Sequence, residues 1–252
     1  MLKLIVYPKG PDPKLINPSP FCAKSEVFLR MAHVEHKIEE FAGNPAKFAK
    51  KKLPVLEIKP GEYICDSYFI QKYLENQFSA KLDQHLSPDM HAEGFAFTKM
   101  LEEFFYWALL HERWFIDENW VKLRDSYFGH IPAILRKFLA GMIRKSSFKS
   151  AWGHGMSRHS DQDILSLGSE CLKHLAHYLG QKPYILGDQV SSYDATSYAF
   201  IASVLHSHLG PELRKSAESY HYLRDYDQRM YQRVFEGQSA TQEEPSRRQA
   251  KS

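Results

Sequence analysis

The chain has 252 residues, a length that suits one large domain or two smaller ones. Hydrophobic residues make up 43% of it and aromatic residues 13%, which excludes a disordered or low-complexity chain. The 33 basic and 30 acidic residues give a net charge of +3, too small to predict binding to nucleic acid or to a membrane surface.

The cysteines and the apolar runs predict the compartment. Cys22, Cys65 and Cys171 are sparse and odd in number, so we expect reduced thiols rather than a disulfide framework. The apolar run at 2–7 stops at Pro8, which is too early for a signal peptide, and no later stretch reaches the roughly 18 apolar residues of a span. We therefore expect a soluble, cytoplasmic protein without a membrane span.

The first 80 residues mix strand and helix signals. Short apolar or alternating runs read as strands, Pro60-Gly61 reads as a turn, and Asp66 and Ser67 can cap a helix. The resulting order is strand, helix, strand, strand, strand, helix, with a short helix before the third strand as an alternative, and it predicts a small α/β domain over 1–80. The expected strands are 2–7, 38–41, 53–58 and 63–64, and the expected helices are 22–32 and 67–74.

Beyond Pro88 the strand signals nearly vanish and apolar residues recur at helical spacing. This pattern predicts an all-α bundle over 88–236. The tail at 237–252 has no large apolar residue, and we expect it to be disordered. The expected helices of the bundle are 89–126, 131–146, 160–180, 191–209 and 213–235.

The segment that leads into the first helix carries the strongest chemical signal. Unpaired N–H groups and the helix dipole stabilise a thiolate at such a place, whether the sulfur belongs to the protein or to a ligand. Ser19 can donate a hydrogen bond there, and Cys22 follows at the spacing of a redox pair whose first cysteine is replaced. The alternative is a proline-rich helix start with a buried cysteine.

Two further segments can bind an extended ligand. If the Leu53-Pro54 bond is cis, the backbone of Val55 lies open for pairing at a strand edge; the alternative is an ordinary proline at a strand start. Asp66 and Ser67 at a helix start suit the ammonium and carboxylate of an amino acid, although simple capping explains them too.

The order of these segments resembles the cytosolic glutathione S-transferases. The matching motifs are Ser-Pro-Phe-Cys at 19–22, Leu-Pro-Val at 53–55, Asp-Ser at 66–67, and Pro-Tyr-Ile-Leu-Gly-Asp at 183–188 followed by Ser191 and Asp194. Residues 19–32 and 153–160 are most similar to the failed axon connections/metaxin-like branch. The resemblance covers about 1–235 and implies a thioredoxin-like α/β domain followed by an all-α helical bundle, the glutathione S-transferase fold.

The resemblance also implies roles for individual residues. Ser19 is the residue that hydrogen-bonds the glutathione thiolate, with Tyr7 and Cys22 as the other catalytic candidates. Glutathione is then a co-substrate, bound through Val55 beside Pro54. Lys52 or Lys51 would meet its glycyl carboxylate, and Asp66 and Ser67 its γ-glutamyl end.

Two functions follow from this resemblance. The first is detoxification, in which the activated thiolate is conjugated to a small apolar electrophile, by a protein that pairs as a homodimer. The second is a non-catalytic binding or adaptor protein of metaxin-like type, since members of that branch are often of uncertain activity. Thiol transfer through Cys22 is a third possibility.

Other polar residues give weaker signals. None of the 13 histidines shows metal-ligand spacing, so we expect no metal site. The basic residues between 136 and 149 suggest a solvated face, with a lipid or partner surface as the alternative.

Overall fold

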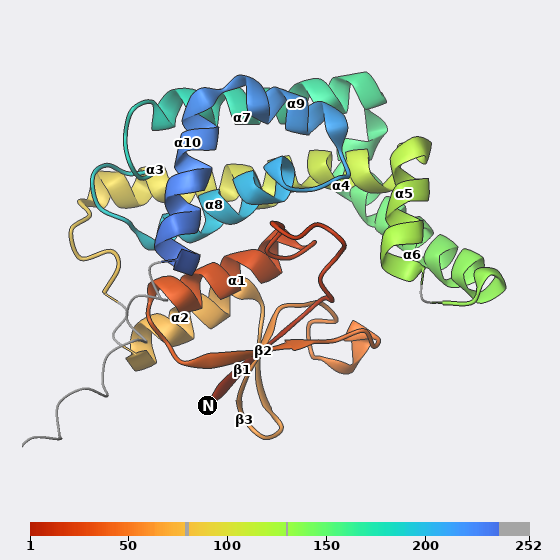
Figure 1. The fold of residues 1–252 in the computed structure, drawn as a ribbon, viewed down its shortest axis with the longest axis horizontal. Helices are drawn as coiled ribbons and strands as arrows, with labels where there is room; N and C mark the ends of the chain where they lie inside the picture. The colour runs from red at the N-terminus through yellow and green to blue at the C-terminus, as the bar shows by residue number, and fades with distance from the viewer. Residues whose placement is uncertain (79–80, 130, 237–252) are drawn as a thin grey trace, which may run out of the picture.

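The computed structural model describes residues 1–78, 81–129 and 131–236, so the predicted tail at 237–252 lies outside the described residues. Figure 1 shows a small β-sheet at the bottom, two helices directly above it, and a layered set of helices above those. All strands precede residue 66, and from Pro88 onward the described elements are helices. The predicted order of an α/β domain followed by an all-α helical bundle is confirmed.

The topology of the sheet brings the ends of three strands together. Strand order is β2-β1-β3-β4, with β1 parallel to β2 and antiparallel to β3, and β3 antiparallel to β4. The carboxyl ends of β1 and β4 and the start of β3 therefore meet at one end of the sheet. The strands are β1 (Leu2–Val6), β2 (His36–Glu40), β3 (Val55–Lys59) and β4 (Glu62–Cys65).

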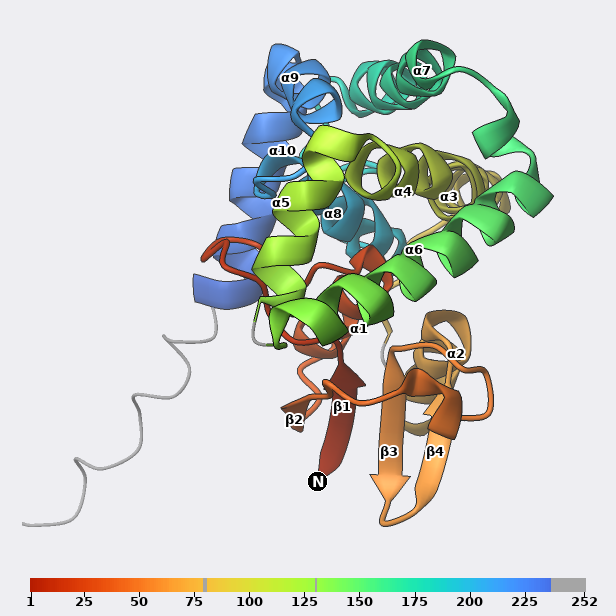
Figure 2. The same ribbon diagram turned by 90° about the vertical axis from the view of Figure 1, so that its right-hand side faces the viewer.

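Helix α1 (Pro20–Met31) lies between the sheet and the helical layer. It contacts β1 on one side and α8 (Ser192–Leu205) on the other, while α2 (Ser67–Phe78) packs beside it on β3 and β4. Figure 2 shows the same stacking from the side. Ten of the twelve residues of α1 are buried, because this helix is covered on both faces.

The structure divides the helical region more finely than the sequence predicted. The expected helix 89–126 is interrupted by a π-helical turn and by Ile116, whose extended backbone (φ −74°, ψ 119°) starts a new helix. Tyr220, also extended, splits the expected helix 213–235. The elements are η1 (Pro45–Lys47), α3 (Pro88–Lys99), η2 (Met100–Phe105), α4 (Tyr106–Trp114), α5 (Asp117–Phe128), α6 (Ala133–His154), η3 (Met156–Arg158), α7 (Asp161–Leu179), α9 (Pro211–Ser219), α10 (His221–Tyr231) and η4 (Gln232–Glu236).

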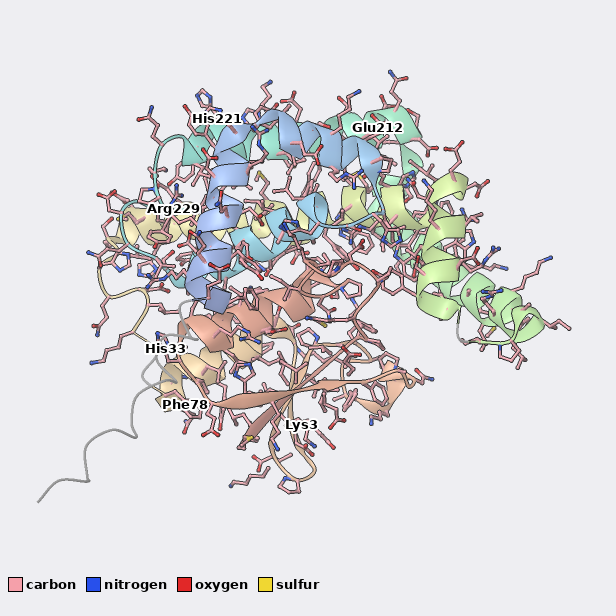
Figure 3. All side chains as sticks on the ribbon, viewed as in Figure 1. Lys3, His33, Phe78, Glu212, His221 and Arg229 are labelled. Atoms are coloured by element: carbon pink, nitrogen blue, oxygen red, sulfur yellow. The ribbon has the colours of Figure 1, made fainter. Side chains whose placement is uncertain are left out.

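Figure 3 marks the extent of the molecule, with Lys3 on the sheet and Glu212 and His221 on the far side, where α9 and α10 begin.

A buried cap stabilises the start of α8. Asp194 in the first turn of α8 accepts hydrogen bonds from the backbone N–H of Ser191 and of Ile185, each at 2.8 Å. Ser191 and Asp194, which belong to the motif matched in the sequence, thus form a capping box at the start of α8.

Candidate functional site

The three segments singled out in the sequence meet at one end of the sheet. Tyr7 and the loop to Ser19 follow β1, Pro54 precedes β3, and Asp66 follows β4. Because β1 and β4 run in the same direction and β3 runs in the opposite one, these residues share the end of the sheet from which α1 and α2 begin. The topology thus builds one candidate site from segments far apart in the chain.

Ser19 is the N-cap residue of α1. Its backbone is extended (φ −92°, ψ 118°), and its partly exposed hydroxyl accepts a long hydrogen bond of 3.5 Å from the N–H of Cys22. Asn17 fixes this position, because its amide donates to the carbonyl of Tyr7 at 2.8 Å and accepts from the N–H of Ser19 at 3.0 Å. The hydroxyl therefore stands at the positive end of a helix, able to donate to an anion.

Cys22 faces the interior. It is 0% exposed, and burial raises the pKa of its thiol to about 12. Tyr7 lies close by and is partly buried; burial raises the pKa of its phenol as well, so it stays protonated near neutral pH. The structure thus gathers the three catalytic candidates, and only Ser19 and Tyr7 retain contact with solvent.

The Leu53-Pro54 peptide bond is cis. Val55, however, is aligned with Ile5 of β1 and with Cys65 of β4, so its backbone lies between two strands rather than at an open edge. The expectation of an edge at Val55 is wrong because β4 covers that side of β3. Leu53, just before the cis bond, lies outside the strand ladder.

Asp66 and Ser67 form the turn from β4 into α2. Asp66 has a φ of 87°, a left-handed backbone that is uncommon for a residue with a side chain and that concentrates at functional sites. Its exposed carboxylate accepts from the N–H of Tyr68 at 3.0 Å. Ser67 opens α2 and is buried at 7% exposure, so both residues lie at a helix N-terminus.

One residue of the lysine run at 50–52 lies at this turn, whereas the sequence interpretation named Lys51 and Lys52 for the glycyl carboxylate. Lys50 was not singled out by that interpretation. Its Nζ atom lies 3.6 Å from an oxygen of the Asp66 carboxylate and 4.0 Å from the centroid of the Phe69 ring. Lys51 and Lys52 are exposed, and neither forms an ion pair with any described residue. Only the run of three lysines hinted at Lys50, since sequence spacing cannot say which of them turns toward β4.

Arg113 of α4 is a second residue that the sequence interpretation missed. Its buried guanidinium donates to the carbonyl of Pro18 at 3.2 Å and to that of Ser203 in α8. It thereby ties the residue before Ser19 to the helical layer. The available signal was that Arg113 is the single arginine of α4.

Aromatic rings lie beside the start of α1. Phe21 packs edge-on against Tyr106 of α4 at 5.0 Å and against Phe200 of α8 at 5.7 Å between ring centroids. Phe21 and Tyr106 keep partial exposure next to Ser19. An apolar group bound near Ser19 would meet this wall.

Neither a metal cluster nor a membrane span is found in the part of the chain that the structure describes. No three His, Cys, Asp or Glu side chains gather there in a metal-binding group. The helices of the described residues are too short or too polar to cross a bilayer. The site itself offers the Ser19 hydroxyl at the start of α1 and the Asp66 carboxylate at the start of α2 as polar groups for a ligand.

Comparison with known proteins gives relatives of two kinds. The chain is 29% identical over 194 residues to the isoprene-epoxide–glutathione S-transferase of Rhodococcus sp. (strain AD45), covering 74% of this chain and 80% of that one. It is 28% identical over 212 residues to Failed axon connections of Drosophila melanogaster, covering 80% of this chain and 50% of that one. It is also 29% identical to human Metaxin-1, covering 69% of this chain and 38% of that one.

Solved structures share the fold at low identity. A glutathione transferase homologue from Sulfitobacter with bound glutathione has a TM-score of 0.59 at 13% identity, covering 96% of this chain and 98% of that one. An apo glutathione S-transferase III has a TM-score of 0.58 at 13% identity, covering 97% and 98%. Family models match the glutathione S-transferase N-terminal domain at residues 20–120 and its C-terminal domain at 168–230, together more than half of the chain. The chain belongs to the glutathione S-transferase superfamily, with Failed axon connections and the metaxins among its relatives.

Proposed function

We propose that this protein binds glutathione at the sheet end described above and activates its thiol for conjugation. The observation that carries the proposal is Ser19, a partly exposed hydroxyl at the N-terminus of α1, at the end of the sheet where the cis bond at Pro54 precedes β3. A hydroxyl donor and a helix dipole both favour the thiolate, so the thiol pKa of a bound glutathione falls. Tyr7 stays protonated and is the second donor within reach of this position.

The remaining residues suit the rest of the tripeptide. The backbone of Leu53, outside the ladder, pairs with the cysteinyl unit in place of Val55. Asp66 accepts from the γ-glutamyl ammonium, and the first N–H groups of α2 with the Ser67 hydroxyl hold its carboxylate. Lys52 is exposed and free to meet the glycyl carboxylate.

The reaction needs an electrophile with an apolar body. The glutathione thiol loses its proton to solvent, and the thiolate attacks an electrophilic carbon held against Phe21 and Tyr106. For an epoxide, the substrate class in the name of the Rhodococcus relative, the C–S bond forms as the C–O bond opens, and the alkoxide takes a proton from water. This chemistry uses no redox step.

A Ser19→Ala variant tests the mechanism. We expect conjugation of a general aromatic electrophile to fall by about tenfold or more, because an anion-stabilising donor is lost. Ser87→Ala is the matched control, since Ser87 caps α3 in the same way at 3.2 Å and lies outside the site. Turnover that drops equally in both variants, or in neither, removes Ser19 from the mechanism.

A non-catalytic binding or adaptor protein is the second candidate. Its support is that Failed axon connections is nearly as similar to the chain as the transferase is, at 28% against 29% identity. Calorimetric titration with glutathione separates the two: binding that weakens in Ser67→Ala supports the first function, and no heat at millimolar glutathione supports the second.

Thiol transfer through Cys22 is a weaker alternative. The thiol is buried and its raised pKa of about 12 leaves almost no thiolate at neutral pH. A Cys22→Ser variant should therefore retain any activity of the wild type. The cytoplasmic location, a role in detoxification and a homodimer stay predictions.

A further inference from the structure

Helix α6 turns its large apolar side chains away from the protein. Ile134 is 88% exposed and Phe138 is 65% exposed, although both belong to a described helix of 22 residues. Exposed apolar residues recur at intervals of four along two neighbouring rows, so they share one side of the helix. We call this side the α6 outer face; it comprises Ile134, Leu135, Phe138, Leu139, Met142 and Ile143.

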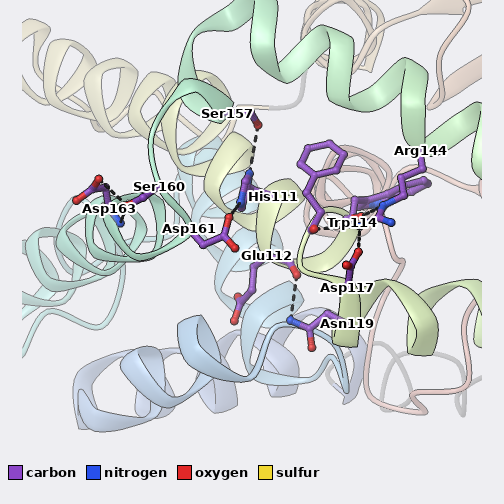
Figure 4. A network of polar contacts seen from close by, with 11 residues as sticks. His111, Glu112, Trp114, Asp117, Asn119, Arg144, Ser157, Ser160, Asp161 and Asp163 are labelled. Atoms are coloured by element: carbon purple, nitrogen blue, oxygen red, sulfur yellow. Dashed lines mark hydrogen bonds and ion pairs between the residues drawn. The ribbon is translucent and has the colours of Figure 1, made fainter.

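The opposite side of α6 holds the helix against the body through small and charged residues. Ala140 and Ala151 are the buried residues of the helix. Arg144 donates to the carbonyl of Trp114 at 2.8 Å and pairs with Asp117 at 2.6 Å, as Figure 4 shows. Such polar contacts orient the helix, so the exposure of its apolar residues is a built feature of the fold.

Arg136 adds a second orienting contact, 3.6 Å from Asp125 of α5. In Figures 1 and 2, α6 lies on the outside of the helical layer, beyond α4 and α5. A contiguous apolar surface of this kind marks an interaction site on a soluble protein.

The positive charge of α6 indicates which kind of partner the α6 outer face binds. Residues 133–154 contain five Lys and Arg and no Asp or Glu. Arg136 and Arg144 are paired with acidic residues of the body, whereas Lys137, Lys145 and Lys149 are exposed and form no ion pair with a described residue. An apolar face flanked by lysines is complementary to an anionic lipid surface.

We propose that α6 is an interfacial helix that docks the protein on anionic membranes through the α6 outer face. The helix lies in the plane of the interface, because it is not apolar enough to span a bilayer. A second copy of the chain fits less well, since a two-fold contact through α6 would set lysine against lysine without a carboxylate in either helix. This inference is independent of glutathione binding.

Vesicle flotation tests the docking. The protein should float with vesicles of equal parts phosphatidylcholine and phosphatidylserine, should not float with phosphatidylcholine alone, and should be released by salt. Phe138→Ser and Lys145→Glu should each weaken this binding by about tenfold or more, since burial of a phenyl ring and attraction to anionic lipid are lost. The matched controls are Phe95→Ser, at a residue 56% exposed on α3, and Lys215→Glu on α9; both should bind like the wild type.

Trp152 gives a second readout. It is 50% exposed and lies five turns beyond Ile134, on the same side of α6. Its fluorescence should shift to the blue on phosphatidylserine vesicles, and Trp152→Phe should abolish the shift. Absence of vesicle binding, equal binding to neutral vesicles, or binding unaffected by Phe138→Ser would overturn the proposal. A dimer in solution that Phe138→Ser dissociates, without flotation, would assign the face to a second copy instead.

Discussion

Helices α8 and α6 are both rich in apolar residues, yet they have opposite environments. Twelve of the 14 residues of α8 are buried, against two of the 22 residues of α6. The neighbours explain the difference: α8 is covered by α1, α9 and α10, whereas α6 meets α4 and α5 on one side only. Apolar content alone therefore does not define the core, because the partner surfaces decide which apolar residues lose contact with water.

One pair of substitutions compares the two helices directly. Phe200 in α8 is 0% exposed, and Phe200→Ala should lower the free energy of unfolding by about 4 kcal/mol through the lost burial and the cavity. Phe138→Ala in α6, 65% exposed, should change it by no more than about 0.5 kcal/mol. Denaturant unfolding measures both. Equal losses would mean that the α6 outer face is covered within the folded chain.

The buried cap of α8 predicts the next largest effect. Asp194 also accepts from the Tyr226 hydroxyl at 2.8 Å, so Asp194→Ala leaves several buried donors unpaired. We expect the free energy of unfolding to fall by about 3 kcal/mol. Asp188→Ala, at an exposed residue just before the helix, is the control and should be nearly neutral. Equal stability of the two variants would contradict the assigned role of the cap.

The contact between the two domains includes a buried ion pair. Lys24 of α1 lies 2.6 Å from Glu102 of η2, and both side chains are less than 10% exposed. Lys24→Met should cost about 2 kcal/mol, because Glu102 keeps only Lys99 at 3.2 Å. The double variant Lys24→Met/Glu102→Met should recover much of this loss. A double variant as unstable as the sum of the two single variants would show that the pair is not coupled.

A smaller effect is expected at alkaline pH. The pKa of the Cys22 thiol is raised to about 12 in the folded protein, above its ordinary value near 9. The folded state therefore binds more protons than the unfolded state between these values, and its stability falls as the pH rises from about 9 to about 12. Cys22→Ala should make the alkaline decline shallower in denaturant unfolding measured across this range. An identical decline in both proteins would place the thiol in contact with water.

The sequence predicted the fold well because its strongest signals are local. The Ser191–Asp194 box lies within four residues, and the start of α1 follows a proline-rich loop. The candidate site depended on longer contacts. Strand β4 covers Val55 because of how the strands pair. Arg113 reaches Pro18 because segments 95 positions apart in the chain pack together. Neither leaves a periodic pattern in the sequence.

Which side of α6 faces the protein and which faces solvent could not be predicted either. Its apolar residues suggested a helix of the bundle, and its basic residues suggested a solvated face. Only the contacts of Arg136 and Arg144 with α5 show that the basic residues split between the two sides. The helix also ends later than the predicted residue 146, at the left-handed Gly155.

A crystal structure of the protein soaked with glutathione tests the central claim most directly. The account predicts glutathione across the end of the sheet, with its sulfur within hydrogen-bond distance of the Ser19 hydroxyl and its γ-glutamyl group at Asp66 and Ser67. Glutathione bound elsewhere, or a sulfur that contacts Tyr7 and not Ser19, would contradict it.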